Sequence, residues 1–228
     1  MPFPDLGKGN WLFLSHVMDK DTPAYGGGKG LEVDRVRDMK KGDSCNASML
    51  AFSNHLGSHV DAPLHFVDGG KAVADFAVNE WIFTKPLIVD VPVEDGTVLK
   101  VSHFETALSN ADDGDLLLIR TGFETKRNQD VYWSNAPAYD PELAGYFHDC
   151  LPSLKAVGLD TISIGSPNHR AMGHAVHQAF LGQGLRIFED LALNIVPANS
   201  ELQVVFALPL LFQNADGAPC TMIGLIKE

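Results

Sequence analysis

The chain has 228 residues, of which 45% are hydrophobic, and its 17 basic and 29 acidic side chains give a formal net charge of −12. This composition is typical of a folded protein with a sizeable core and excludes a largely disordered chain. An acidic chain without runs of lysine or arginine also argues against nucleic acid or an anionic membrane surface as a partner.

The start of the chain and the cysteines predict a cytoplasmic protein. Residues 1–5 lack a basic segment followed by an apolar run, so we expect no signal peptide. No apolar run reaches the roughly 20 residues that are needed to span a bilayer. The cysteines are widely spaced and odd in number, which predicts reduced, mostly buried thiols. They are Cys45, Cys150 and Cys220.

The first half of the chain predicts short strands joined by loops rich in glycine and proline. Strands are predicted over residues 11–17, 31–41 (an edge strand), 46–53 and 86–91. Short helices are predicted over residues 74–81 and 102–108, the second because Ser102 and Glu105 form a capping box. Tyr25 precedes three glycines in a loop that either lines a small-molecule pocket or simply connects two strands.

The second half alternates between buried strands and helices. Strands are predicted over residues 116–121, 161–165, 185–189, 203–211 and 221–226. Helices are predicted from residue 141, interrupted by Pro152 and ended by Gly158, and over residues 168–181. Tyr132 is placed in a polar loop. Arg120 has either a functional role or an acidic partner, and we favour the acidic partner. Without repeats or linkers, residues 1–228 predict one α/β domain with a mixed, barrel-like sheet flanked by helices.

The stretch 55–66 carries the strongest functional signal. Its odd positions hold the side chains His55, His59, Asp61 and His65. An extended chain points them toward one face, whereas a helix would turn Asp61 away and end at Pro63. An ideal strand keeps residues four apart about 13 Å from each other, but ligands approach one ion to about 2.0–2.2 Å. We therefore predict a metal site with a bend at Gly57; ordinary structural histidines are the alternative.

The second half of the chain offers further ligands for such a metal. His174 and His177 share one helix face, and Glu189 faces the same side as the apolar residues of its strand. A divalent cation would balance a buried carboxylate there. Alternatively, Glu189 pairs with Arg186 or caps a turn, although Arg186 has the opposite parity. His169 and His174 are interpreted as structural residues or as groups that support the ligands. The remaining histidines, His16, His103 and His148, are interpreted as surface or core residues.

The motif His55-x-Gly57-Ser58-His59-x-Asp61-x-Pro63-x-His65-Phe66 resembles the signature of the cyclase family, which includes bacterial kynurenine formamidases and isatin hydrolases. The resemblance covers most of the chain from about residue 46, with further blocks at 116–123, 158–164, 177–189, 207–210 and 216–219. It implies that His65 is the catalytic histidine. It implies a metal site formed by His55, His59, Asp61, His177 and Glu189. It also implies a swivelling β/β/α type of fold and a homo-oligomer, such as a dimer or tetramer.

Three positions depart from the family pattern. Ser58 replaces the usual threonine and retains its hydroxyl group. Residues 24–28 replace a tryptophan-containing loop of kynurenine formamidases, and Gly165 stands where many members carry aspartate. These changes leave the implied metal ligands intact but leave the substrate open.

Together the residues predict a metal-dependent hydrolase of a small amide, formamide or lactam. The metal would activate a water molecule, and His65 would carry a proton to the leaving nitrogen. We expect one or two zinc ions. We also expect a small-molecule substrate, for which an aromatic compound is one candidate. One alternative is isatin hydrolase-like opening of a lactam with manganese. The others are a metal-dependent cyclase or dehydratase and a non-catalytic metal-binding protein.

Overall fold

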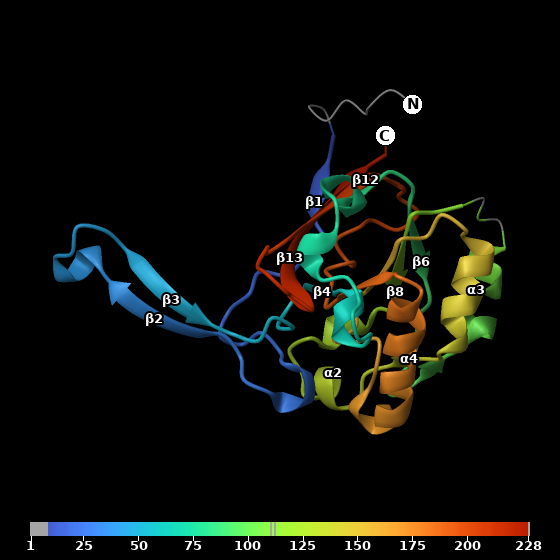
Figure 1. Ribbon diagram of the computed structural model, residues 1–228, viewed down its shortest axis with the longest axis horizontal. Helices are drawn as coiled ribbons and strands as arrows, with labels where there is room; N and C mark the ends of the chain where they lie inside the picture. The colour runs from blue at the N-terminus through green and yellow to red at the C-terminus, as the bar shows by residue number, and fades with distance from the viewer. Residues whose placement is uncertain (1–8, 110, 112, 228) are drawn as a thin grey trace.

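Short strands make up most of the secondary structure. The computed structural model describes residues 9–109, 111 and 113–227 (Figure 1). Residues 1–8, which include the segment used to predict the absence of a signal peptide, lie outside the described residues. The strands are β1 (Trp11–Phe13), β2 (Glu32–Arg37), β3 (Ala47–Ala51), β4 (His59–Asp61), β5 (Ile82–Phe83), β6 (Pro86–Asp90), β7 (Val98–Leu99), β8 (Leu116–Arg120), β9 (Ala138–Tyr139), β10 (Ala156–Leu159), β11 (Arg186–Glu189), β12 (Leu202–Pro209) and β13 (Gly217–Ile226). The α-helices are α1 (Glu105–Leu108), α2 (Val131–Ser134), α3 (Glu142–Cys150) and α4 (Arg170–Gly182).

The main sheet is mixed and curls into a nearly closed barrel. Its strand order is β5-β12-β13-β4-β11-β10-β8-β6, and β1 pairs with β13. The strands β6, β8, β10 and β11 are parallel neighbours, whereas β4 runs antiparallel to both β11 and β13. The predicted α/β class and the mixed, barrel-like sheet are therefore confirmed. Among the described helices, none is long and apolar enough to cross a membrane.

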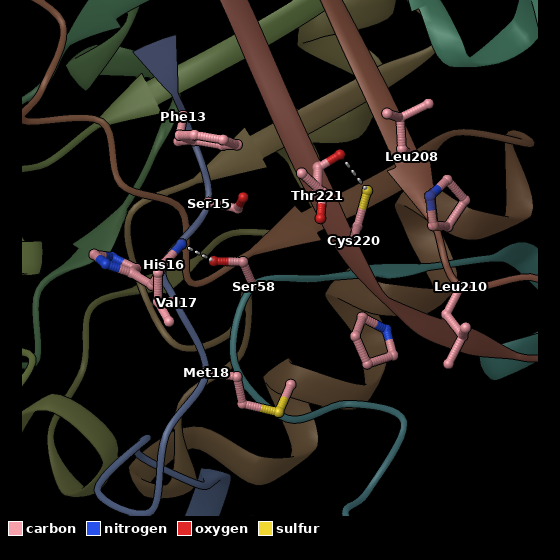
Figure 2. A pocket seen from close by; sticks show the side chains of 12 residues that line it. Phe13, Ser15, His16, Val17, Met18, Ser58, Leu208, Leu210, Cys220 and Thr221 are labelled. Carbon is pink, nitrogen blue, oxygen red and sulfur yellow. Dashed lines mark hydrogen bonds between the residues drawn. The ribbon is translucent and has the colours of Figure 1, made fainter. Parts of the chain in front are cut away.

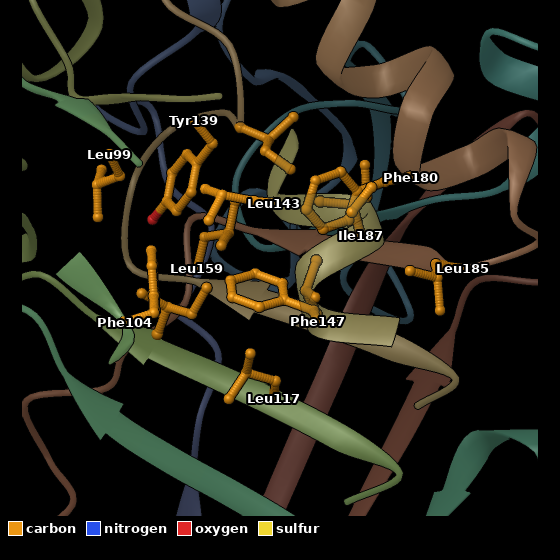
Figure 3. Packing of buried hydrophobic residues seen from close by; sticks show 14 of the residues in the cluster. Leu99, Phe104, Leu117, Tyr139, Leu143, Phe147, Leu159, Phe180, Leu185 and Ile187 are labelled. Carbon is orange, nitrogen blue, oxygen red and sulfur yellow. The ribbon is translucent and has the colours of Figure 1, made fainter. Parts of the chain in front are cut away.

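Alternation along the parallel strands divides the core into two layers. Leu117 and Ile187 face α3 and α4, where they belong to one cluster with Phe147 and Phe180 (Figure 3). The neighbouring residues of the same strands face the inside of the barrel: Leu116, Leu118 and Phe188. Because Glu189 has the parity of Ile187, the register directs its carboxylate toward the helix side of the sheet.

Two predictions around residues 158–165 are wrong. α3 ends at Cys150, and Gly158 lies inside the buried strand β10 instead of ending a helix. A Cβ atom on Gly158 would lie 2.6 Å from Cδ2 of Leu118, so the strands pack closely because this residue has no side chain. Residues 161–165 are buried but form no strand. Their backbone is engaged elsewhere, since the amide of Ile164 donates to Oε1 of Glu189 at 2.7 Å.

Several smaller predictions are also corrected. α1 begins after Phe104 without a side-chain cap, so Ser102 does not form the predicted capping box. Residues 74–81 form two short 3₁₀ turns, and Tyr132 lies in α2 with its side chain fully buried. The last strand begins at Gly217, before the predicted residue 221, because glycine and proline at its start resemble a turn. The three cysteines are free, but Cys45 is exposed.

The hairpin of β2 and β3 forms an arm that projects from the body of the protein (Figure 1). The two strands pair only with each other, so residues 31–41 do not supply an edge strand to the main sheet. Every residue of β2 is exposed. Val33 and Leu50 lie opposite each other across the hairpin and are 56% exposed each, which is unusual for such an apolar pair.

Candidate metal centre

The bend predicted in the histidine stretch is present at Gly57. Its φ angle is +69°, in the left-handed region that glycine adopts without strain. The chain then enters β4 at His59 and a 3₁₀ turn, η3 (Pro63–His65). The bend folds His55 back over β4, so that its Nδ1 atom lies 2.8 Å from Oδ1 of Asp61.

The register of β4 brings in the carboxylate of Glu189. β4 lies between β11 and β13, and His59 is directly opposite Glu189. Residues directly opposite each other in an antiparallel pair project to the same side. Accordingly, Nε2 of His59 lies 3.4 Å from Oε2 of Glu189 and 3.4 Å from Oδ1 of Asp61.

α4 supplies the second buried histidine. Nε2 of His177 lies 3.7 Å from both Oδ2 of Asp61 and Oε1 of Glu189. Nδ1 of His177 donates to the carbonyl of Gly173 at 2.6 Å, and Nδ1 of His59 donates to the carbonyl of Gly57 at 2.8 Å. Each backbone carbonyl therefore fixes the tautomer and presents Nε2 to the carboxylates, as ligating histidines require.

The donor set fits one or two divalent cations. Oδ2 of Asp61 is buried and has no hydrogen-bond partner among the described residues. Ligands about 2.1 Å from a shared ion lie roughly 3.4 Å apart in a tetrahedral site, which matches the spacing of His59 from both carboxylates. Among the described residues, the ligand atoms of each of three groups lie within 4.8 Å of one another. Asp61 belongs to two of these groups, which are His55, His59 and Asp61, and Asp61, His177 and Glu189; the third is His55, His65 and Asp216. The structure thus brings all five predicted ligands together.

Asp216 is a member of this cluster that the sequence reasoning missed. One of its oxygens, Oδ2, lies 2.8 Å from Nδ1 of His65 and 3.0 Å from Nε2 of His55. Asn54 donates to the other oxygen at 2.8 Å. The two histidine rings stack with their centroids 4.1 Å apart. Asp216 lies in one of the blocks of family resemblance, but its spacing from the histidine stretch gives no signal of contact.

The charges in the cluster shift the pKa values of its members in opposite directions. Burial disfavours the charged form of His59, but Asp61 and Glu189 outweigh it and hold the pKa of His59 well above its ordinary value. Burial likewise disfavours the carboxylate of Asp61, but His55 and His59 hold its pKa well below its ordinary value. The pKa of His65 is lowered, chiefly by burial. The buried carboxylates are thus ionised and paired with histidines, and a divalent cation bound there would take the place of the histidine protons between them.

Two glycines make room for the histidine rings. A Cβ atom on Gly217, which pairs with Asp61, would lie 2.3 Å from Cε1 of His55. A Cβ atom on Gly165 would lie 3.0 Å from the Cα atom of Gly173 and 3.4 Å from Cε1 of His177. The close approach of α4 therefore explains why this chain has glycine at position 165.

A buried polar network holds β4 and β11 together behind the cluster. Ser58 donates to the carbonyl of Asp190, and the hydroxyl of Ser58 accepts from the amide of His16 at 2.8 Å (Figure 2). The carboxylate of Asp190 accepts two bonds from Arg127, at 2.8 and 2.7 Å, and one from Tyr132 at 2.7 Å. The hydroxyl that replaces the family's threonine hydroxyl is thus engaged next to His59.

Other side chains singled out in the sequence lie away from the ligand atoms. Nη2 of Arg120 donates to Asp90 at 2.9 Å, which confirms the predicted acidic partner. Arg186 is buried against the rings of Phe76, Trp81 and Phe83, on the face of β11 opposite to Glu189.

His174 makes an edge-to-face contact with Phe66, whose ring stacks on His177. The remaining histidines do not belong to the cluster; His103 and His148 are exposed, and His16 and His169 are half-buried.

Two hollows adjoin this part of the sheet. One, of about 600 Å³, lies beside β1, β12 and β13 and contains none of the clustered histidines (Figure 2). The other, of about 490 Å³, opens onto the cluster and is the candidate active site. Its lining combines the cluster with Tyr25, Phe66, Ile162, Pro167, Arg170 and His174. Tyr25 thus lines the pocket, which was one of its two predicted roles.

Comparison with known proteins decides the family. Residues 12–166 match the family model described as "Putative cyclase". The chain belongs to the cyclase family. Among curated relatives of this cyclase-family chain, the kynurenine formamidase of Geobacillus thermodenitrificans (strain NG80-2) is 29% identical over 212 residues, covering 92% of the chain and 94% of the relative. The kynurenine formamidase of Polaromonas naphthalenivorans (strain CJ2) is 26% identical, covering 92% and 88%.

Solved structures share the fold of this cyclase-family chain. Isatin hydrolase A from Labrenzia aggregata, bound to benzyl benzoate, matches with a TM-score of 0.81 and 19% identity, covering 96% of the chain and 94% of the hydrolase. A protein described as a "potential metal-dependent hydrolase with cyclase activity" matches with a TM-score of 0.71 and 21% identity, covering 97% and 100%. The fold expected from the resemblance is therefore confirmed.

Proposed function

We propose that this cyclase-family chain is a metal-dependent hydrolase that cleaves the C–N bond of a small amide, formamide or lactam. The observation that carries this proposal is the buried set of histidines and carboxylates in which Oδ2 of Asp61 lacks a partner among the described residues. The kynurenine formamidase relatives support the choice of bond. Zinc is the metal we propose, since two or three imidazoles with carboxylates are typical zinc ligands.

The proposed ligands are His55, His59, Asp61, His177 and Glu189. A divalent cation in such a set lowers the pKa of a coordinated water toward neutrality and polarises a substrate carbonyl. The chain's own contribution is to keep the two carboxylates ionised, to orient all five donors and to shield them largely from bulk water. Backbone carbonyls orient His59 and His177, and the amide of Ile164 orients Glu189.

His65 is the proposed proton carrier. Asp216 engages its Nδ1 atom, while Nε2 makes no hydrogen bond to the described residues and is the nitrogen able to exchange a proton with a substrate. In this role Nε2 accepts a proton from the attacking water and donates one to the nitrogen that leaves. The ring lies beside the ligands because it stacks on His55. A protein that only stores metal would have no use for a proton-carrying pair such as His65 and Asp216 beside the ligands.

The hollow suits a flat, partly apolar substrate. Phe66, Ile162 and Pro167 supply apolar surface beside the cluster, and Tyr25 faces the same hollow. An aromatic ring packed there would hold the amide carbonyl near His65 and exclude water from one side of it. We therefore propose an aryl amide, an aryl formamide or a lactam fused to an aromatic ring.

The proposal is tested with protein loaded separately with zinc and with manganese. An aryl formamide and an isatin-like lactam are incubated with each form, and released formate or ring-opened acid is measured. Turnover of either compound, abolished by chelator and restored by metal, is the expected result. Higher activity with manganese on the lactam would favour the isatin hydrolase-like alternative. Inertness of both forms toward the whole panel would contradict the proposal and leave a cyclase, a dehydratase or a non-catalytic role.

A further inference from the structure

Asp190 has a strained backbone directly after the candidate ligand Glu189. Its φ angle is +53°, in the left-handed region that residues with a Cβ atom rarely adopt. Among the described residues other than glycine, Asn199 and Asn214 also have a positive φ angle, and both lie in exposed turns. Asp190, in contrast, is buried. Strain of this kind persists only where the surroundings enforce it, and it gathers at functional sites.

Two side chains hold Asp190 in this conformation. Arg127 donates to both carboxylate oxygens, at 2.8 Å to Oδ1 and 2.7 Å to Oδ2. The hydroxyl of Tyr132, whose side chain is fully buried, donates to Oδ1 at 2.7 Å. A bidentate guanidinium fixes the direction of a carboxylate as well as balancing its charge. We refer to Asp190, Arg127 and Tyr132 as the Asp190 clamp.

The ion pair in the Asp190 clamp is not explained by stability. The side chains of Arg127 and Asp190 are 13% and 2% exposed. Withdrawing two charges from water costs free energy that can exceed their attraction, and apolar side chains of similar volume are often as stabilising. Apolar side chains, however, cannot hold a backbone at one φ angle through directed hydrogen bonds. The arrangement therefore favours a geometric role for the pair.

The backbone of Asp190 connects the clamp to two candidate ligands. Its amide donates to the carbonyl of Thr161 at 2.8 Å, and its carbonyl accepts from the hydroxyl of Ser58. Ser58 precedes His59, which lies directly opposite Glu189 in the pairing of β4 with β11. A turn of the Asp190 backbone would therefore break the bond to Ser58 and rotate the peptide that follows Glu189.

We propose that Asp190 is a positioning residue for the metal centre: its left-handed backbone, held by Arg127 and Tyr132, fixes the spacing of the ligands on β4 and β11. The proposal rests on the metal site of the proposed function. When the clamp is broken, Asp190 relaxes toward a negative φ angle in the metal-free protein, and metal binding must restore the strained conformation. Affinity falls in proportion to the fraction of protein in the competent conformation. The intact clamp thus raises metal affinity by preorganising the ligands.

The first test compares Asp190→Gly with Asp190→Ala. Both variants lose the carboxylate and leave Arg127 without its partner, but glycine adopts a positive φ angle freely and alanine does not. The probe is cobalt(II), whose affinity is measured by competition with a chelator. We expect both variants to bind it more weakly than wild type, and Asp190→Ala more weakly than Asp190→Gly by about fivefold to thirtyfold. Equal affinities in the two variants, or wild-type affinity in both, would overturn the proposal.

The second test makes smaller changes in the clamp. Tyr132→Phe removes one hydroxyl, and Arg127→Lys keeps the charge that Arg127→Gln removes. Each should weaken cobalt binding and shift the visible absorption bands of bound cobalt, which depend on ligand geometry. Arg127→Lys should bind cobalt more tightly than Arg127→Gln. Wild-type affinity and bands in all three variants would contradict the proposal.

Arg120→Gln is the matched control. It breaks another bidentate pair, in which Arg120 donates to both carboxylate oxygens of Asp90 away from the ligands. It should lower the midpoint of thermal unfolding and leave the affinity for cobalt and the absorption bands unchanged. The same loss of affinity in Arg120→Gln would assign the effect to general destabilisation and overturn the proposal.

Hydrolysis of an aryl formamide by the same samples separates this proposal from the proposed function. If cobalt binds with the expected ranking of variants but the formamide is not hydrolysed, the hydrolase function fails and the role of Asp190 stands. If the wild type hydrolyses the formamide but Asp190→Gly and Asp190→Ala bind cobalt equally, the role of Asp190 alone fails. A wild type that binds no cobalt would contradict both.

Discussion

Oδ2 of Asp216 lies 2.8 Å from Nδ1 of His65. A carboxylate in this position holds the imidazole in the tautomer whose Nε2 accepts a proton, and it stabilises the ring once it is protonated. We therefore expect Asp216→Asn to lower kcat by about tenfold to a hundredfold while metal content is retained. Kinetics and elemental analysis on the same sample check this. Loss of metal together with activity would instead make Asp216 a ligand.

His65→Ala should separate proton transfer from metal binding. The ring stacks on His55 and contacts Asp216, but it is not one of the five proposed ligands. Removing it should lower kcat by about a hundredfold to ten-thousandfold and leave the bound metal unchanged. His148→Ala, at an exposed position on α3, is the control and should keep full activity. Metal lost in parallel with activity would identify His65 as a ligand.

Glu189→Gln should weaken metal binding. Oε1 is held by the amide of Ile164 and the hydroxyl of Ser163, so the amide of the variant would turn its NH₂ group toward Nε2 of His59. An amide NH₂ group has no free lone pair, so it cannot coordinate the metal in place of the carboxylate oxygen. We therefore expect metal affinity to fall at least about tenfold. Competition with a chelator measures this. Unchanged affinity and rate would remove Glu189 from the site.

Gly217→Ala should disturb the site through packing alone. The added Cβ atom would lie 2.3 Å from Cε1 of His55 and 2.9 Å from the carbonyl oxygen of Val60, which belongs to the backbone of β4. His55 must therefore move, and we expect weaker metal binding together with lower activity. Gly145→Ala in α3, where nothing lies within 4 Å of the new atom, is the matched control. Normal metal affinity in Gly217→Ala would show that His55 is not a ligand.

The arm is expected to mediate self-association. A two-stranded hairpin is marginally stable alone in water, and this arm exposes Val33 and Leu50 side by side. A second copy of the chain that covers this pair would stabilise it. Sedimentation should show a dimer or larger assembly that dissociates in Val33→Asp and Leu50→Asp. Val78→Asp, at an apolar side chain that is 80% exposed on the body, should leave the assembly intact. A wild-type monomer at micromolar concentration would contradict this.

Local periodicity predicted the parts of the site that depend on one segment. The parity of His59 and Asp61 and the orientation of Glu189 relative to Arg186 follow from alternation along an extended chain. The bend at Gly57 follows from the short distance between ligands that one metal ion requires. The pairing of β4 with both β11 and β13 follows from neither, because strand order depends on contacts between distant segments. Helical spacing therefore offered His177 as only one of several candidate ligands, and the family resemblance assigned it to the site.

The contacts of Asp216 and Gly217 were missed for the same reason. Asp216 touches His55 across 161 positions of sequence, and Gly217 acts by having no side chain. In the sequence both look like parts of a turn before the last strand. The errors at Gly158 and at residues 161–165 have a related cause, since close packing and a bond to Glu189 there override the local pattern.

Gly217 also bears on how tolerance to mutation is read in this protein. Every other amino acid has a Cβ atom, and that atom would collide with the ring of His55. A scan of all substitutions should therefore rank position 217 with the histidines, although glycine can neither transfer a proton nor hold an ion. Intolerance at this position would measure the room that an imidazole ring needs rather than a chemical role.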